Sequence, residues 1–226
     1  TMAGRLESLR RALELENIPT RMECFDISHS SGEATVASCV VFDANGARKT
    51  DYRKFNIKNI AAGDDYAAMQ QALERRYKRL ANGEGQLPDI LFIDGGKGQV
   101  SQARQVLATY DISSVKVVGV AKGTTRKAGF ETLVDADSGA EMRLRGDHPG
   151  LHLIQQIRDE AHRFAISGHR SQRAKARKQS LLEDIPGVGA KRRRELLRHF
   201  GSAKAIENAS VEELSKIKGI SDSVAR

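Results

Sequence analysis

The sequence predicts an α/β protein, a mixed sheet flanked by helices, followed by a small all-α domain. Strand-like apolar runs and amphipathic stretches follow one another in the order β-β-β-α-β-α-β, which is not the regular alternation of a doubly wound sheet. Beyond about residue 180 no strand-like run occurs, and a short glycine-containing motif is repeated. A polar stretch rich in Arg and Lys separates the two parts. We therefore expect domains at residues 1–171 and 181–226, joined by a basic linker at 172–180.

The first elements are predicted to be a helix and a three-stranded antiparallel meander. Residues 1–17 carry leucines at helical spacing. Asn45-Gly46 is typical of a two-residue hairpin turn, and residues 30–32 indicate another turn. The three strands are expected at residues 21–27, 35–43 and 48–55.

The next elements place two more strands between helices. Their order predicts that the fourth strand pairs in parallel beside the first. The remaining elements are expected to be a helix at about 64–80, a strand at 90–94, a helix ending near 109, a strand at 115–120, a weak hairpin at 131–144 and a long amphipathic helix after Pro149.

The charge balance indicates a polyanionic partner, with nucleic acid as the first candidate. Lys and Arg number 37 against 29 Asp and Glu, a formal net charge of +8. No apolar run approaches the ~18 residues that a membrane span needs, and no signal segment opens the chain, so we expect a cytoplasmic protein without membrane contact. Cys24 and Cys39 fall in predicted strands, which fits reduced core thiols.

Asp26 and Asp94 are the first candidates for chemistry. Each lies near the end of a predicted strand, and parallel pairing of these strands would bring the two carboxylates together. Two adjacent carboxylates repel one another unless a cation lies between them, and hard oxygen ligands favour Mg²⁺ or Mn²⁺. Such a metal on a basic protein suggests hydrolysis of a nucleic-acid strand. The alternative for Asp94 is a helix N-cap.

His162 is a candidate third metal ligand or general acid-base group, because imidazole titrates near neutral pH. The alternative is an ordinary surface or core histidine, and the pattern does not select it from its neighbours. Other candidates in or near the same helix are His148, His152 and His169, with Asp159 and Glu160 either as ligands or as partners of Arg158 and Arg163.

Three other groups have weaker signals. Asp64 and Asp65 precede a helix, where capping is the plain alternative. Lys97 and Lys122 follow strand ends and could contact a phosphate, or they could be solvated lysines. The glycines around Lys97 lack the spacing of either nucleotide-binding motif, so ATP and NAD are set aside.

The C-terminal repeat predicts a small pseudo-symmetric helical unit that contacts the DNA backbone. The stretch 185–192 is echoed at 217–221, with short helices expected at 190–199, 202–208 and 211–216. Glycine permits a positive φ in a tight turn, and the N–H groups at the following helix start can hold a phosphate. A plain helical turn is the alternative. The candidate DNA-binding residues are Gly187, Gly189, Lys191, Arg192 and Gly219.

Five motifs resemble the UvrC family, the nuclease subunits of bacterial nucleotide excision repair. They are Glu23-Cys24-Phe25-Asp26-Ile27-Ser28-His29, Gly63-Asp64-Asp65-Tyr66, Ile93-Asp94-Gly95-Gly96-Lys97-Gly98-Gln99, Val120-Ala121-Lys122-Gly123 and residues 158–165. The resemblance covers nearly the whole chain. It implies an RNase H-like endonuclease domain followed by tandem helix-hairpin-helix motifs.

The same resemblance implies site residues and partners. It assigns a catalytic set to Asp26, Asp94 and His162, with Asp65 as a further implicated aspartate. It also implies incision on the 5′ side of a lesion in damaged double-stranded DNA, together with the helicase-like partner UvrB.

Two departures from the family pattern lead to further expectations. The family's N-terminal nuclease and the segments that bind UvrB are not in this sequence, which suggests a fragment. Ser221 stands where the first hairpin has Gly189, and the last helix looks truncated, so we expect a weakened grip on DNA. The rival hypotheses are a non-catalytic DNA-binding scaffold of a repair complex and, less favoured, an enzyme that cuts RNA or Holliday junctions.

Overall fold

The computed structural model describes residues 1–29, 35–123, 129–183 and 185–226, without the side chains of 169 and 171–181. The predicted turn at 30–32 lies outside the described residues. The chain divides into two compact units, Thr1–His169, called unit 1, and Arg170–Arg226, called unit 2. Among the described residues, no helix combines the length and the apolar character that crossing a membrane requires.

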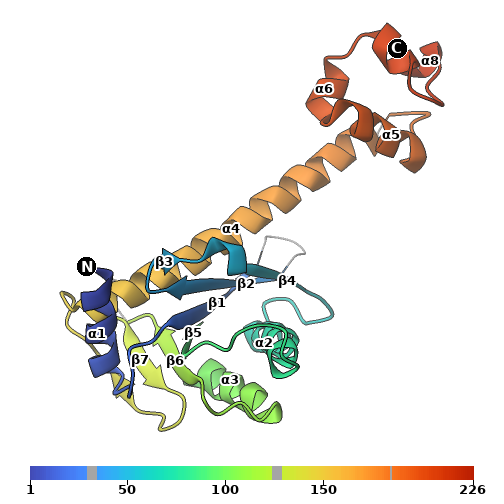
Figure 1. Ribbon diagram of the computed structural model, residues 1–226. Helices are drawn as coiled ribbons and strands as arrows, with labels where there is room; N and C mark the ends of the chain where they lie inside the picture. The colour runs from blue at the N-terminus through green and yellow to red at the C-terminus, as the bar shows by residue number, and fades with distance from the viewer. Residues whose placement is uncertain (30–34, 124–128, 184) are drawn as a thin grey trace. The chain divides into compact units, whose positions relative to one another are not determined.

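Unit 1 contains one mixed sheet, as the sequence predicts (Figure 1). The strand order is β3-β2-β1-β5-β6-β7-β8, and β4 also pairs with β2. β5 is parallel to both β1 and β6, while the other pairs are antiparallel. The strands are β1 Arg21–His29, β2 Thr35–Asp43, β3 Gly46–Ala47, β4 Arg53–Ile57, β5 Ile90–Asp94, β6 Lys116–Ala121, β7 Thr132–Asp135 and β8 Glu141–Met142.

Helices cover both faces of this sheet. α2 (Asp65–Ala81) and α3 (Lys97–Thr109) pack together on one face, and the first part of α4 (Pro149–Glu183) packs on the other (Figure 1). Alternating residues of β1 show this, because Glu23 contacts Arg76 of α2 whereas Asp26 contacts His162 of α4. α1 (Met2–Ala12) adds Leu6 and Leu9 to the core.

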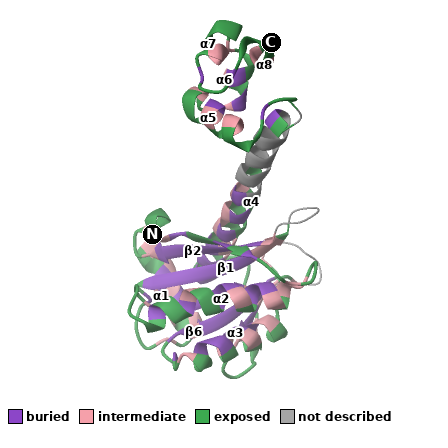
Figure 2. Cartoon of the chain, turned by 90° about the vertical axis from the view of Figure 1, so that its right-hand side faces the viewer, coloured by how far each residue is buried: buried purple, intermediate pink, exposed green. Residues whose placement is uncertain are grey.

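The core lies between the sheet and these helices. The central strands are almost continuously buried, in agreement with their apolar sequences (Figure 2). Buried aromatic rings of Phe25, Phe42, Phe92 and Tyr77 fill the space on either side. Cys24 and Cys39 are buried free thiols in this core, and burial raises the pKa of both.

The predicted third strand at 48–55 is wrong in its first half. A short 3₁₀ helix, η1 (Lys49–Asp51), occupies that half, and β4 begins only at Arg53. Asp51 accepts hydrogen bonds from Arg21 at 2.7 Å and from Arg48 at 3.0 Å. These ion pairs hold the segment away from the strand pairing of the sheet. The alternation of charged and aromatic residues, on which the prediction of a strand rested, does not indicate such ion pairs.

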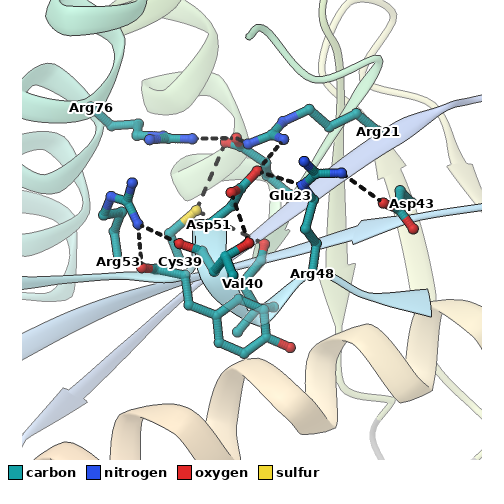
Figure 3. A network of polar contacts seen from close by, with 11 residues as sticks. Arg21, Glu23, Cys39, Val40, Asp43, Arg48, Asp51, Arg53 and Arg76 are labelled. Atoms are coloured by element: carbon teal, nitrogen blue, oxygen red, sulfur yellow. Dashed lines mark hydrogen bonds and ion pairs between the residues drawn. The ribbon is translucent and has the colours of Figure 1, made fainter. Parts of the chain in front are cut away.

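A buried ion network joins η1 and β1 to α2 (Figure 3). Glu23 is fully buried and accepts hydrogen bonds from Arg76 at 2.6 Å and Arg21 at 3.4 Å. The Cys39 thiol donates to its second carboxylate oxygen at 3.8 Å. Arg21 also pairs with Asp51 of η1. The Glu23 carboxylate therefore links β1, the strand that carries Asp26, directly to α2 and through Arg21 to η1.

Unit 2 is helical, with its own small apolar core. Its helices are α5 (Ala190–Phe200), α6 (Ala203–Glu207), α7 (Val211–Ser215) and α8 (Asp222–Ala225). Residues 172–180, expected as a linker from their composition, are helical and belong to α4. The buried residues that form this core are Leu182, Val188, Leu196, Ile206, Ile217 and Ile220.

Candidate active site

Asp26 and Asp94 lie beside each other where the parallel pairing of β1 and β5 ends. The register places Phe25 opposite Ile93, so the two aspartates are the next residues of their strands. β5 is four buried apolar residues followed by Asp94. Because neighbouring parallel strands present paired positions on the same face, both carboxylates point to one side of the sheet.

These aspartates line an open pocket of about 330 Å³, which we call the carboxylate pocket. Asp65 and Lys122 line it as well, from the start of α2 and the end of β6. The turn between β5 and α3 supplies Gly95, Gly96 and Gln99. Ligands of α/β sheets commonly bind beyond the carboxyl ends of parallel strands, which is where this pocket lies.

Asp26 has the most perturbed carboxyl group of the pocket. Its side chain is 7% exposed, and the His162 Nδ1 atom lies 3.2 Å from its Oδ2. Burial and the nearby Asp94 carboxylate raise the pKa of Asp26 to about 6, against the opposing effect of His162. The His162 side chain is 62% exposed, so its ring contacts Asp26 and also faces solvent.

Secondary structure around the pocket leaves Asp94 without a capping role. The N-cap of α3 is Gly96, and no side chain caps that helix. The Gly95 N–H instead donates to the Val120 carbonyl at 3.2 Å, which continues the β5–β6 ladder by one residue. The Ser38 hydroxyl of β2 donates to the Ala161 carbonyl of α4 at 3.0 Å. This hydrogen bond ties α4 to the sheet at the residue before His162.

The two aspartates before α2 have separate roles in the structure. Asp64 is the N-cap and accepts from the Ala67 N–H at 3.0 Å. Asp65 therefore is not needed as a cap, and its carboxylate pairs closely with His29 Nε2. The other ring nitrogen of His29 lies 2.8 Å from the Thr35 hydroxyl. Sequence reasoning missed His29 as a contact of Asp65, because nothing in the spacing links β1 to α2.

The other histidines near α4 have local partners away from the pocket. His148 Nδ1 accepts from the Gly150 N–H at 3.0 Å, and His152 Nε2 lies 2.7 Å from the Gly146 carbonyl oxygen. The side chain of His169 lies outside the described residues. Of the described histidines in this region, His162 is therefore the one that contacts Asp26.

The remaining charged candidates have ordinary ion-pair partners. Glu160 pairs with Arg163 at 2.7 Å and accepts from the Tyr52 hydroxyl at 3.0 Å. Asp159 pairs with Arg158 at 3.4 Å and is 73% exposed. Lys97 lies 3.4 Å from Glu141 and does not line the carboxylate pocket, whereas Lys122 does.

Gln99 is a pocket residue that sequence reasoning did not select. It lies in the first turn of α3, and its amide folds back over Gly95, where a Cβ atom would overlap it. Its Oε1 atom is buried and has no hydrogen-bond partner in the described structure. Gly95 is the sequence signal for this arrangement, because the backbone has no room for a side chain there, whereas a Cβ on Gly96 would meet no atom of the described residues within 4 Å.

The donor chemistry of the pocket fits a hard divalent cation. The Asp26 and Asp94 carboxylates are suitable ligands, and the mutual repulsion that raises the pKa of Asp26 is relieved by a cation. The His162 imidazole contacts Asp26 from outside the pocket lining. Among the described residues, no three His, Cys, Asp or Glu side chains gather closely enough to hold an ion by themselves. Neutral oxygens or water would have to complete the coordination.

The glycine turns of unit 2 are duplicated in backbone geometry as well as in sequence. Gly187 and Gly219 have φ values of 82° and 92°, which favour glycine. Gly189 does not use the positive φ that glycine permits, since this residue is the N-cap of α5 with a φ of −73°. Ser221 is the N-cap of α8 with a φ of −85°, so serine takes the place of glycine there without strain.

The two basic residues at the first turn differ in their surroundings. Lys191 is exposed at the start of α5. The Arg192 guanidinium donates to the Gly187 carbonyl and lies 3.7 Å from the position of a Cβ on Gly219, so its side chain lies between the two turns. Arg192 therefore holds the turns together, and Lys191 is the better placed of the two for a phosphate.

Family models match both parts of the chain. The model described as the UvrC RNAse H endonuclease domain matches residues 10–166, and the SAM-like helix-hairpin-helix tandem matches residues 180–226. UvrABC system protein C of Pseudomonas putida is 60% identical over 99% of this chain and 37% of its own length. The protein of the same name from Pseudomonas syringae is also 60% identical, over 99% of this chain and 37% of its own length. The chain thus spans little more than a third of these relatives.

Solved structures show weaker likenesses. Human ENDOV has a TM-score of 0.42 at 12% identity, covering 74% of this chain and 98% of its own. Endonuclease V of Streptomyces avermitilis has a TM-score of 0.41 at 15% identity, covering 76% of this chain and 93% of its own. At these scores neither structure adds to the functional case.

Proposed function

The chain belongs to the UvrC family, and we propose that it is the part of a nucleotide excision repair nuclease that hydrolyses a DNA phosphodiester on the 5′ side of a lesion. The division into an endonuclease domain at residues 1–171 and a DNA-binding domain at 181–226 is part of this proposal, as is action in the cytoplasm. Damaged double-stranded DNA would be the substrate and UvrB the partner. The family and the carboxylate pocket support it.

The adjacency of Asp26 and Asp94 is the observation that carries the proposal. A protein holds two carboxylates together at a cost unless a cation offsets their repulsion. Asp26, Asp94 and His162, together with neutral oxygens or water, would hold Mg²⁺ or Mn²⁺. When bound, the ion would supply Lewis-acid activation of the phosphate and of the attacking water.

The residues of the pocket, and His162 beside it, would divide the work by position. Asp26, nearly buried, fixes one side of the site, and His162, mostly exposed, can exchange a proton with solvent. Asp65 lies at the rim, oriented by His29, where it can accept a hydrogen bond from an attacking water. Lys122 is exposed at the end of β6 and can neutralise the scissile phosphate.

Unit 2 would hold the DNA backbone without reading its sequence. The exposed N–H groups at the starts of α5 and α8 follow the two glycine turns, and such groups contact phosphates. Gly187, Gly189, Lys191 and Gly219 belong to this surface, with Arg192 holding the turns in place. Lys97 stays a candidate phosphate contact.

An incision assay tests the proposal with Asp94→Asn, which keeps the side-chain shape and removes the charge. On a damaged duplex with one labelled strand, Mn²⁺ and UvrB, we expect the variant to lose at least about 100-fold in nicking. Binding to DNA should be unchanged. Asp159→Asn is the matched control, because Asp159 is exposed on α4 outside the pocket, and it should cut like the wild type.

Two outcomes would count against the proposal. Full nicking by Asp94→Asn would remove the pocket from catalysis, and a wild-type nick mapped to the 3′ side would contradict the assigned polarity. The rival scaffold hypothesis requires that the wild-type chain binds DNA yet shows neither nicking nor a saturable Mn²⁺ site.

A further inference from the structure

Gln99 lines the carboxylate pocket together with Asp26 and Asp94. Gln99 is the third residue of α3, and its side chain turns back toward the loop that follows β5. The space that a Cβ of Gly95 would fill is taken by the amide group. The loop is therefore shaped so that this amide can approach the end of β5.

The Oε1 atom of Gln99 is buried and has no hydrogen-bond donor in the described structure. Leaving a buried carbonyl oxygen unpaired costs free energy, and native proteins do so rarely. An unpaired oxygen on a residue that lines the same pocket as two carboxylates is suited to a partner that is not a protein group. An N–H donor would satisfy it alone, whereas a cation would satisfy it and both carboxylates at once.

The carboxylates of the pocket and the neighbouring His162 imidazole do not by themselves form a set that holds an ion. No three of the described His, Cys, Asp and Glu side chains gather closely enough to hold an ion. Hard divalent cations take amide oxygens as well as carboxylates. A neutral oxygen adds a ligand without adding to the repulsion between Asp26 and Asp94.

We propose that the Gln99 amide oxygen is a further ligand of the divalent cation held by Asp26 and Asp94, an inference that rests on the proposed function. The glycine at position 95 then has a defined task, which is to leave room for the ligand. The φ of Gly95 is not positive, so alanine is compatible with the backbone there and would act only by displacing the amide.

Titration of Mn²⁺ into the 226-residue chain without DNA, followed by calorimetry, tests this inference apart from catalysis. Gln99→Met keeps the length of the side chain and removes the oxygen, and we expect its Mn²⁺ affinity to fall about 10-fold. Gln99→Glu restores an oxygen and should bind at least as tightly as the wild type. Gly95→Ala should weaken binding as Gln99→Met does.

Gln102→Met is the matched control. Gln102 lies one turn later in α3, also has a buried unpaired Oε1, and donates to Gln70 at 3.0 Å outside the pocket. Its variant should bind Mn²⁺ like the wild type. Metal-free thermal unfolding gives a second readout, since removing an unpaired buried oxygen should not lower the Tm of Gln99→Met, whereas a purely structural role would lower it.

The outcomes separate this inference from the proposed function. If Asp94→Asn abolishes Mn²⁺ binding while Gln99→Met binds normally, Gln99 is not a ligand and the proposed function stands. If Gln99→Glu weakens binding as Gln99→Met does, the amide nitrogen rather than the oxygen matters, and the inference is overturned. If Asp94→Asn binds Mn²⁺ like the wild type, the proposed metal site itself is wrong.

Discussion

Asp26 is held in a state that costs the folded protein stability. Its carboxyl is nearly buried and lies beside a second carboxylate, and both effects favour the protonated form. His162 on α4 lowers the pKa of Asp26, and this offsets only part of the two effects. Active sites often retain such costs because the same arrangement binds a ligand.

The pH dependence of stability should therefore reveal Asp26 in the metal-free protein. Because its pKa is about 6 when folded and 3.8 ordinarily, the folded state binds its proton more tightly. That contribution is present below about pH 4 and is lost as pH rises through about 6. In EDTA near pH 7.5, Asp26→Asn should raise the free energy of unfolding by on the order of 2 kcal/mol.

Urea denaturation near pH 5 and pH 7.5 measures this effect, and the gain from Asp26→Asn should be larger at the higher pH. Asp159→Asn is the control, since its side chain is 73% exposed and should give no such pH trend. A gain of equal size at both pH values would show that Asp26 does not titrate in this window.

Residues of the site differ in how far sequence could predict them. The proximity of Asp26 and Asp94 could be anticipated from strand order, because parallel strands end at one edge. His162 does not, because several histidines lie at similar positions and only the packing of α4 on β2 brings one of them to Asp26. Gln99 depends on how a side chain folds over a glycine, which spacing does not encode.

At the scale of elements, the Glu23 network connects the strand of Asp26 to the helix of Asp65 (Figure 3). Glu23 is fully buried between Arg21 and Arg76, whose side chains are 9% and 11% exposed. Removing one member of a buried network leaves an uncompensated charge, which is costly even where the intact network is nearly neutral. The network thus fixes β1 against α2.

Glu23→Gln should consequently lower the free energy of unfolding by about 3 kcal/mol, since it leaves the Arg76 guanidinium without its counter-charge. Urea denaturation at neutral pH measures the loss. Glu7→Gln is a matched control, because Glu7 also pairs with two arginines, Arg10 and Arg11, but on the exposed surface of α1. It should have little effect. Equal losses in both variants would contradict a special role for burial.

The elements themselves were predictable where apolar periodicity is strong. The runs that became β2, β5 and β6 are apolar over most of their length, and the helices have clear starts and ends. The segment 48–55 was not predictable, because η1 is held by ion pairs to Arg21 and Arg48 rather than by local preference. The segment expected as a linker at 172–180 is helical. Its helical backbone was not predictable, because a charged composition indicates exposure to solvent but not backbone conformation.

At the scale of the whole molecule, the positive charge and the repeated turns point to the same kind of partner. The chain has a formal net charge of +8, which favours binding to the DNA backbone whatever the base sequence. The weakened grip on DNA expected from Ser221 and the last helix stays a prediction. In the backbone, Ser221 and Gly189 have nearly the same conformation. Both turns can therefore present N–H groups to a phosphate.

Binding to DNA should consequently depend on salt and not on sequence, and Lys191 should account for part of that dependence. Neutralising a side chain that pairs with one phosphate reduces the slope of log affinity against log salt by about 0.9. We expect a reduction of this size in Lys191→Gln, equal on duplexes of two unrelated sequences. Lys204→Gln is the control, because Lys204 is exposed on α6 away from the turns. An effect restricted to one sequence, or an equal change in both variants, would mean that the turn after Gly187 does not contact the backbone.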